Sequence, residues 1–250
     1  MIKFLTSDFK MYKKIDGIKI PNEIDNTNSI VNQIKENLNK NNTILFIASS
    51  PNDVEKTESY SSILFEALKL SGISFNNYII LDSRNKEQAK ELISNADLIF
   101  LSGGSTYTQN LFFKEISLSE LLLEFNGVLI GQSAGALNMS KEVFNSPEEL
   151  DESEPIYFDG LGLTDINIEP HFELQYDISS QEEKFQRDTI LEESNKREIF
   201  GQCNGSHIII DENDNIVVYG ETYLIKNGNI QLICKNGEKL SINNNSIKLK

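Results

Sequence analysis

Six consecutive residues combine a serine hydroxyl with small neighbours: Gly131-Gln132-Ser133-Ala134-Gly135-Ala136. They directly follow the apolar run Gly127-Val128-Leu129-Ile130, which predicts a buried strand. Small residues around Ser133 permit a tight strand-to-helix turn, which lifts the hydroxyl above the end of the sheet and aims the amide of Ala134 at an oxyanion. This spacing favours acyl transfer by a serine nucleophile, although the same residue types also form ordinary turns.

A serine hydroxyl is a weak nucleophile by itself, so Ser133 needs a base within hydrogen-bond reach. The chain has two histidines. His207 lies beside an isoleucine-rich run, which favours a structural role in a strand that faces the core. His171 follows Pro170 at the end of a short predicted strand, where an α/β protein places its functional loops. We therefore expect His171 to be the base, with an ordinary surface-loop histidine as the alternative.

The pair Gly103-Gly104 follows another predicted strand, Asp97 to Leu101. Glycine lets a backbone amide approach a substrate oxygen closely, so the amides of Gly104 and Ala134 would together form an oxyanion hole. The simpler alternative is a sharp exit from the strand, which adjacent glycines also allow.

The segments around these residues predict alternating strands and helices. Expected strands cover residues 1–8, 43–48, 78–81, 97–101, 127–130 and 166–168, and expected helices cover 25 or 26 to 38, 54–70, 86–94 and 181–193. Residues 11–24 contain Gly17 and Pro21 without clear periodicity, so we expect them to be irregular. Apolar strands joined by helices indicate a parallel sheet covered on both faces, with ligands beyond the carboxyl ends of the strands.

The last part of the chain changes character. From Ser206 to Ile247, short runs rich in isoleucine, valine and tyrosine are separated by Asp-Asn and Asn-Gly turns, which predicts an antiparallel meander. No linker rich in proline, glycine or serine divides the chain. We therefore expect residues 1–250 to form a single domain.

Composition excludes several classes of partner. The net charge of −15 disfavours nucleic acid and anionic membranes, and no apolar run approaches the roughly 20 residues that span a bilayer. The N-terminus lacks the apolar core of a signal peptide, which favours a cytoplasmic protein. Cys203 and Cys234 lack metal-site spacing, so we expect reduced thiols and no metal. Acyl transfer by a serine also needs no organic cofactor, and we expect none.

Three segments, in this order and spacing, resemble the peptidase E (alpha-aspartyl dipeptidase) family of serine peptidases, relatives of cyanophycinase. They are Leu101-Ser102-Gly103-Gly104-Ser105-Thr106, Gly131-Gln132-Ser133-Ala134-Gly135-Ala136 and Ile168-Glu169-Pro170-His171-Phe172. The resemblance extends from about Phe4 to the C-terminal strands. It implies a three-layer α/β/α sandwich with a mostly parallel sheet, of the class I glutamine-amidotransferase-like type. It also implies that Ser133 is the nucleophile, His171 the base, and Gly104 and Ala134 the oxyanion-hole donors.

The third member of the implied triad is where this sequence departs from the family. The family's acid lies in a Gly-x-x-Glu-Gly segment, and the matching segment here is Gly201-Gln202-Cys203-Asn204-Gly205. Asparagine can orient an imidazole but cannot stabilise the imidazolium by charge. Glu152, Glu154 or Asp165 would be the acidic alternatives to Asn204. A second departure is Ser105, where the family commonly has asparagine.

Peptidase E cleaves dipeptides with an N-terminal aspartate, which implies a cation near the site to receive that carboxylate. The resemblance implies Arg187 as this substrate-binding residue, with Lys184 as a second candidate in the same helix. The alternative is that both are solvated, because long charged side chains lie on helix surfaces by default.

These residues support two hypotheses from different classes. The first is a serine peptidase that hydrolyses small peptides, with Ser133, His171 and Asn204 as its triad. The second, motivated by Asn204, is a catalytically weak or inactive relative that binds a small acidic ligand or a protein partner in the same cleft. An amidotransferase-like subunit is disfavoured, because those enzymes carry cysteine at the strand-to-helix turn (the nucleophile elbow) where this sequence has Ser133.

Overall fold

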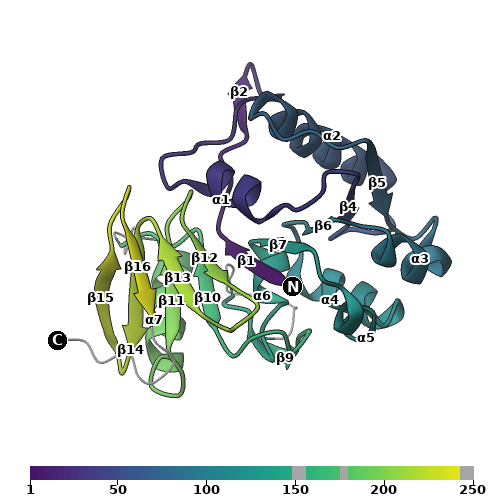
Figure 1. The fold of residues 1–250 in the computed structure, drawn as a ribbon. Helices are drawn as coiled ribbons and strands as arrows, with labels where there is room; N and C mark the ends of the chain where they lie inside the picture. The colour runs from purple at the N-terminus through teal and green to yellow at the C-terminus, as the bar shows by residue number, and fades with distance from the viewer. Residues whose placement is uncertain (148–155, 175–179, 243–250) are drawn as a thin grey trace.

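The computed structural model describes residues 1–147, 156–174 and 180–242. Its main element is an eight-stranded sheet in the order β16-β13-β12-β1-β7-β6-β4-β5 (Figure 1). These strands are β1 (Ile2–Thr6), β4 (Thr43–Ile47), β5 (Asn77–Leu81), β6 (Leu98–Leu101), β7 (Val128–Gln132), β12 (His207–Ile210), β13 (Ile216–Tyr219) and β16 (Lys239–Ile242). Strands β1, β7, β6, β4 and β5 run parallel, as predicted, and β12, β13 and β16 extend the sheet antiparallel from β1.

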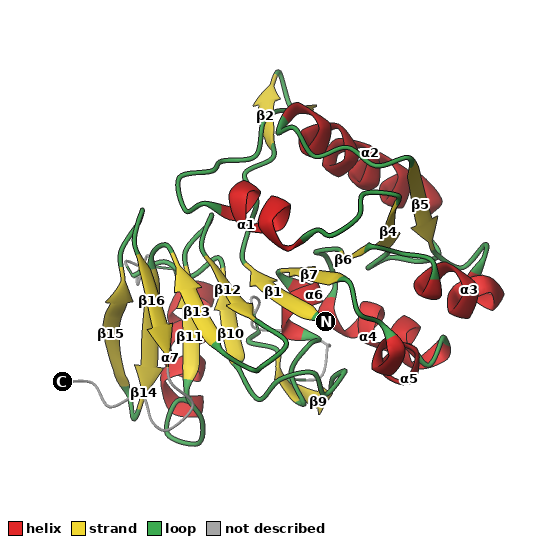
Figure 2. Cartoon of the chain, viewed as in Figure 1, coloured by secondary structure: helices red, strands yellow, loops and turns green. Residues whose placement is uncertain are grey.

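Helices cover both faces of this sheet, which confirms the predicted α/β/α layers (Figure 2). They are α1 (Ile30–Asn37), α2 (Val54–Leu70), α3 (Ala89–Ser94), α4 (Thr106–Glu115), α5 (Leu118–Leu121) and α6 (Ala134–Leu137), with short 3-10 turns at Lys86–Gln88 and Leu122–Glu124. Neighbouring residues of a strand point to opposite faces. Phe4 of β1 therefore packs with α1 and α2, whereas Leu5 packs with α3 to α6. No helix in the described ranges combines the length and the apolar character needed to span a bilayer.

A second sheet of four strands lies beside the first. Its order is β10 (Asn167–Pro170), β11 (Ile199–Gln202), β14 (Thr222–Lys226) and β15 (Asn229–Cys234). Helix α7 (Gln181–Glu193) packs against it through Ile190, which contacts an apolar cluster around Phe172 and Tyr223. The C-terminal strands are antiparallel, as predicted, but they do not form one meander. The chain leaves the main sheet after β13, adds the β14–β15 hairpin to the small sheet, and returns as β16.

The prediction that residues 11–24 are irregular was wrong. Strands β2 (Tyr12–Ile15) and β3 (Ile18–Pro21) form an antiparallel hairpin that contacts α2. Asp16 and Gly17 both have positive φ, 49° and 81°, at the tip between them. An Asp-Gly pair is a strong hairpin signal, which the apparent lack of periodicity concealed. A second short hairpin joins β8 (Glu142–Phe144) and β9 (Tyr157–Asp159).

The first helix begins later than predicted, at Ile30 rather than near Asp25 or Asn26. The Asp25 carboxylate accepts the amide of Thr27, and the side-chain oxygen of Asn26 accepts the amide of Val31. These side-chain bonds stabilise a turn that competes with the helix.

His207 is buried inside the main sheet, in agreement with the structural role predicted for it. Its side chain is 1% exposed and stacks between Phe4 and Tyr219, with ring centroids 6.3 Å and 4.8 Å away. Neither ring nitrogen has a hydrogen-bond partner among the described residues. Burial lowers the pKa of His207 to about 3, because nothing compensates the charge of the protonated ring.

This burial predicts a loss of stability in mild acid. Below about pH 6.5 the histidine takes up a proton in the unfolded chain but stays neutral in the fold, so stability falls by about 1.4 kcal/mol per pH unit. Between pH 7 and pH 5 the contribution is roughly 2 kcal/mol. His207→Phe should remove this part of the pH dependence, measured by urea unfolding at both pH values. His171→Gln is the control, and an equal acid response in His207→Phe and the wild type would contradict the assignment.

Candidate active site

Ser133 occupies a strained turn between β7 and α6. Its φ is 48° and its ψ is −109°, a conformation that non-glycine residues adopt mainly at functional sites. Neighbouring glycines make the turn possible. A Cβ atom on Gly131 would lie 2.6 Å from the Ala136 nitrogen, and one on Gly135 would lie 2.2 Å from the Leu101 carbonyl oxygen. The close packing of α6 against β6 and β7 therefore requires glycine at both positions, which agrees with the predicted elbow.

Three predicted residues from separate segments meet at this elbow. His171 follows β10 with a φ of 57°, and its Nε2 lies 3.1 Å from the Oγ of Ser133. Its Nδ1 lies 2.7 Å from the Oδ1 of Asn204, in the turn after β11. Strands β10 and β11 are paired in parallel, so their carboxyl ends deliver histidine and asparagine to one place. The arrangement has the connectivity of a serine triad, with an amide in the place of the acid.

Ser7, which was not predicted, forms hydrogen bonds with two members of this triad, His171 and Asn204. It follows β1 and its side chain is fully buried. Its Oγ accepts the backbone amide of His171 at 2.7 Å and donates to the Oδ1 of Asn204 at 3.2 Å. The hydroxyl therefore fixes both the backbone of the histidine and the side chain of the asparagine.

The two residues predicted to supply oxyanion-hole amides lie near the serine: Gly104 lines the same cavity as Ser133, and Ala134 follows it in the chain. Gly104 has a φ of 144° in the loop between β6 and α4. A Cβ atom there would lie 2.3 Å from the Oγ of Ser49, so the position accepts only glycine without movement. Ser49 in turn donates to the Gly103 carbonyl oxygen at 2.6 Å and holds the loop in place. The amides of Gly104 and Ala134 donate to no other described residue, which leaves both available to an oxyanion.

A cavity of about 370 Å³ opens next to these groups. Ser133, His171 and Gly104 line it together with Asp8, Lys19 and Lys56, three charged residues that were not predicted. Neither lysine forms an ion pair with another described residue. Two lysines against one aspartate give the cavity wall a net positive charge, in a protein whose net charge is −15.

Hydrogen bonds connect Asp8, on the wall of the cavity, to Gln132 beside the serine. Gln132 donates from Nε2 to the Asp8 carboxylate at 2.9 Å and accepts the Tyr60 hydroxyl at 2.7 Å. Burial and the nearby negative charge of Asp8 raise the pKa of Tyr60, so its hydroxyl stays protonated. Lys19, on the β2–β3 hairpin, lies with its Nζ 4.6 Å from the ring centroid of Tyr12 and 5.9 Å from that of Tyr60.

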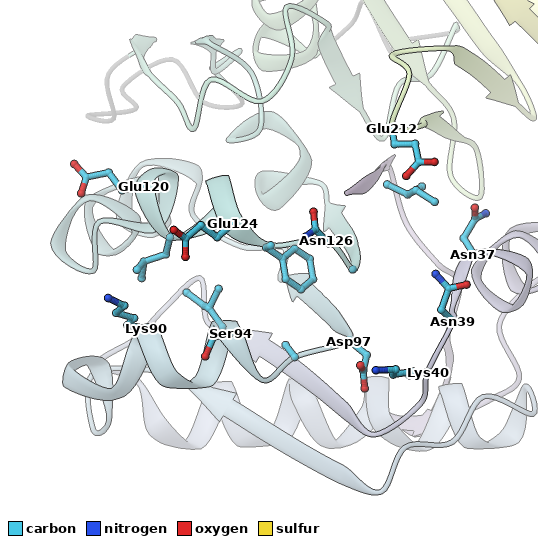
Figure 3. Close-up of a pocket in the computed structure, with 16 residues that line it drawn as sticks. Asn37, Asn39, Lys40, Lys90, Ser94, Asp97, Glu120, Glu124, Asn126 and Glu212 are labelled. Atoms are coloured by element: carbon cyan, nitrogen blue, oxygen red, sulfur yellow. The ribbon is translucent and has the colours of Figure 1, made fainter.

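A larger cavity, of about 560 Å³, lies at the opposite edge of the sheet (Figure 3). It is lined by residues at the amino ends of β6 and β7, including Asp97 and Gly127. The Asp97 carboxylate is already engaged, because it accepts the amides of Asn42 and Thr43 at 2.7 and 2.9 Å. None of the predicted site residues lines this cavity, so volume is a poor guide to the chemistry here.

Comparison with known proteins agrees with this geometry. The family model described as peptidase family S51 matches residues 21–224. The chain belongs to peptidase family S51. A relative named "Probable alpha-aspartyl dipeptidase" from Drosophila melanogaster is 29% identical over 155 residues, and the match covers 60% of each chain. The chain thus matches less than two thirds of that relative's length.

A solved structure shows the same fold. It is the crystal structure of a peptidase E-like protein from Listeria monocytogenes EGD-e, with a TM-score of 0.57 and 20% identity. The superposition covers 87% of this chain and 96% of the Listeria chain. The predicted resemblance to peptidase E is therefore confirmed at the level of family and fold.

The remaining predicted residues lie elsewhere in this S51 chain. Arg187 is half-buried on α7 and does not line the cavity, so its substrate-binding role stays a prediction. Asp165 is exposed beyond the amino end of β10, about 20 Å of extended chain from His171. Glu152 and Glu154 lie outside the described residues. Among the described residues, no group of three or more histidine, cysteine, aspartate or glutamate side chains could hold a metal ion.

Proposed function

We propose that this member of family S51 is a serine peptidase that hydrolyses small peptides by a Ser-His mechanism. The observation that supports it most is the continuous chain from Ser133 through His171 to Asn204. Each contact falls within hydrogen-bond distance, and the nucleophile lies on a strained elbow beside two available amides. Such a site is built for acyl transfer.

The proposed reaction has two halves. The Ser133 oxygen attacks the peptide carbonyl while His171 Nε2 takes its proton, and the amides of Gly104 and Ala134 stabilise the oxyanion. Collapse of this intermediate breaks the C–N bond, and His171 returns the proton to the leaving amine. Water, activated by the same histidine, then hydrolyses the acyl-enzyme and restores the serine. Asn204 accepts from Nδ1–H throughout and keeps the imidazole in position.

The charges of the cavity favour dipeptides with an N-terminal aspartate. Such a residue carries an ammonium and a carboxylate a few bonds from the scissile carbonyl. Asp8 offers a negative partner for the ammonium, and Lys19 and Lys56 offer positive partners for the carboxylate. A cavity of about 370 Å³ is of the size that holds small molecules, which suits a short peptide.

This reading predicts that Lys19 sets the preference for an acidic first residue. We expect Lys19→Gln to lower the ratio of kcat/KM for Asp-Leu over Asn-Leu about tenfold, because one charge-assisted contact of roughly 1.4 kcal/mol is lost. Steady-state hydrolysis of the two dipeptides measures the ratio. Lys13→Gln is the matched control, since Lys13 lies on the same hairpin, paired with Ile20, and does not line the cavity. An unchanged ratio in Lys19→Gln would contradict the role of Lys19.

Asn204 favours a second candidate function, a relative that binds acidic peptides without cleaving them. Calorimetric titration with Asp-Leu, together with an assay for its cleavage products, separates the two: binding without turnover supports the second candidate, and turnover excludes it. The cytoplasmic location and the absence of nucleic-acid and membrane partners remain proposals that follow from composition and charge.

A further inference from the structure

An asparagine beside a catalytic histidine has an ambiguity that an aspartate does not have. The amide can present either its oxygen or its nitrogen to the imidazole. When Oδ1 faces the ring, Nδ1 carries the hydrogen and Nε2 is free to take the Ser133 proton. When the amide is reversed, its N–H donates to Nδ1, the ring hydrogen moves to Nε2, and the histidine cannot act as a base. The orientation of Asn204 therefore decides whether the site can react.

Ser7 removes this ambiguity. Its Oγ accepts the backbone amide of His171 at 2.7 Å, and its own hydrogen points to the Oδ1 of Asn204 at 3.2 Å. The hydroxyl hydrogen of Ser7 favours an oxygen at this position of the Asn204 amide. With a reversed amide the Ser7 oxygen would instead accept from the Asn204 N–H, and the hydroxyl hydrogen would lose its acceptor. Ser7 is fully buried at the end of β1, and its amide donates to the Ser206 carbonyl oxygen.

We infer that Ser7 is a positioning residue, which selects the orientation of the Asn204 amide and through it the base form of His171. This inference rests on the proposed Ser-His mechanism, since the orientation matters only if His171 takes a proton. It assigns to Ser7 a role that an acid at position 204 would make unnecessary, because both oxygens of a carboxylate accept.

The tautomer of His171 can be read without substrate. In protein labelled with ¹⁵N-histidine, long-range ¹H–¹⁵N spectra at about pH 8.5 report which ring nitrogen carries the hydrogen, because histidine is then neutral. The chain has two histidines, and the buried His207 serves as the internal reference. We expect the Nδ1–H form for His171 in the wild type and in Ser7→Thr, and a substantial Nε2–H population in Ser7→Ala.

Two controls distinguish a specific effect of Ser7 on the orientation of the Asn204 amide from general damage to the fold. Ser206→Ala removes another buried hydroxyl, which donates to Cys203, and should leave the tautomer unchanged. Adding Asn204→Asp to Ser7→Ala should restore the Nδ1–H form. Wild type in the Nε2–H form, or Ser7→Ala that keeps Nδ1–H, would overturn the inference. If Ser7→Ala does not fold, a wild-type spectrum in the Nε2–H form would still overturn the inference.

Kinetics test the same coupling through turnover. We expect Ser7→Ala to lower kcat about tenfold, and to lower it less than about twofold in the Asn204→Asp background. An equal loss in both backgrounds would mean that Ser7 acts only through the fold. If the wild type turns over no peptide, the proposed function fails, but the tautomer measurement still decides the role of Ser7.

Discussion

Replacing Ser133 by alanine should abolish peptide hydrolysis, with a loss of about a thousandfold or more in kcat. Alanine keeps the Cβ atom and adds no bulk to the elbow, and removal of Oγ leaves His171 without a nucleophile to activate. The melting temperature should stay close to that of the wild type, because the glycines at positions 131 and 135 hold the turn. Hydrolysis of Asp-Leu measures the first effect, and thermal unfolding the second.

A fluorophosphonate probe gives the same prediction an independent readout. The probe reacts with serines that are activated by a base, so labelling should disappear in Ser133→Ala and in His171→Ala. Ser62→Ala is the control, because Ser62 is an exposed serine of α2 that does not line the cavity. Peptide hydrolysis by Ser133→Ala at the wild-type rate would contradict the proposed mechanism.

Much of the scaffold could be predicted because local rules determine it. The helices Val54–Leu70 and Gln181–Glu193 have the predicted bounds, since each has a capping residue and a clear end. The hairpin Tyr12–Pro21 could not be predicted in the same way. Its strands are largely exposed, so they show no alternation of apolar and polar residues.

The residues of the site also differ in whether the sequence could identify them. Ser133 and His171 could be recognised because their residue types and immediate neighbours already suggest chemistry. Ser7 has no such signal, because its role depends on β1 lying between β7 and β12, with the turn after β11 close by. Its position after a strand, at the edge where parallel strands bind ligands, was the available clue.

The cations Lys19 and Arg187 also show that contacts between distant segments could not be predicted from the sequence. Both are cations in charged or exposed segments, and the resemblance to peptidase E points to Arg187. The structure instead places Lys19 in the cavity, because the hairpin packs against α2 and its lysine lies over Tyr60. Long-range packing therefore decides which cation lines the cavity.

The Asn204 triad leads to the second large expected effect, a gain of activity. We expect Asn204→Asp to raise kcat about tenfold, since hydrogen bonds to charged groups contribute about 1.5–3 kcal/mol against about 0.5–1.5 kcal/mol for neutral ones, and each 1.36 kcal/mol is tenfold in rate. Asn204 Oδ1 already lies 2.7 Å from Nδ1 of His171, so the carboxylate needs no new geometry. It adds a negative charge beside the imidazolium that forms as Ser133 attacks. Steady-state hydrolysis of Asp-Leu measures the gain.

The pH–rate profile of Asn204→Asp provides a second test of the same contact. An opposite charge favours the protonated imidazole, so the acidic limb of the profile should move to higher pH. Asn213→Asp adds the same charge on an exposed loop residue that does not line the cavity, and should change neither rate nor profile. An unchanged rate in Asn204→Asp would contradict the role of Asn204, and would direct attention to Glu152 and Glu154 as the source of negative charge. A gain together with the pH shift would show that this site is limited by the missing charge at position 204, and not by its geometry.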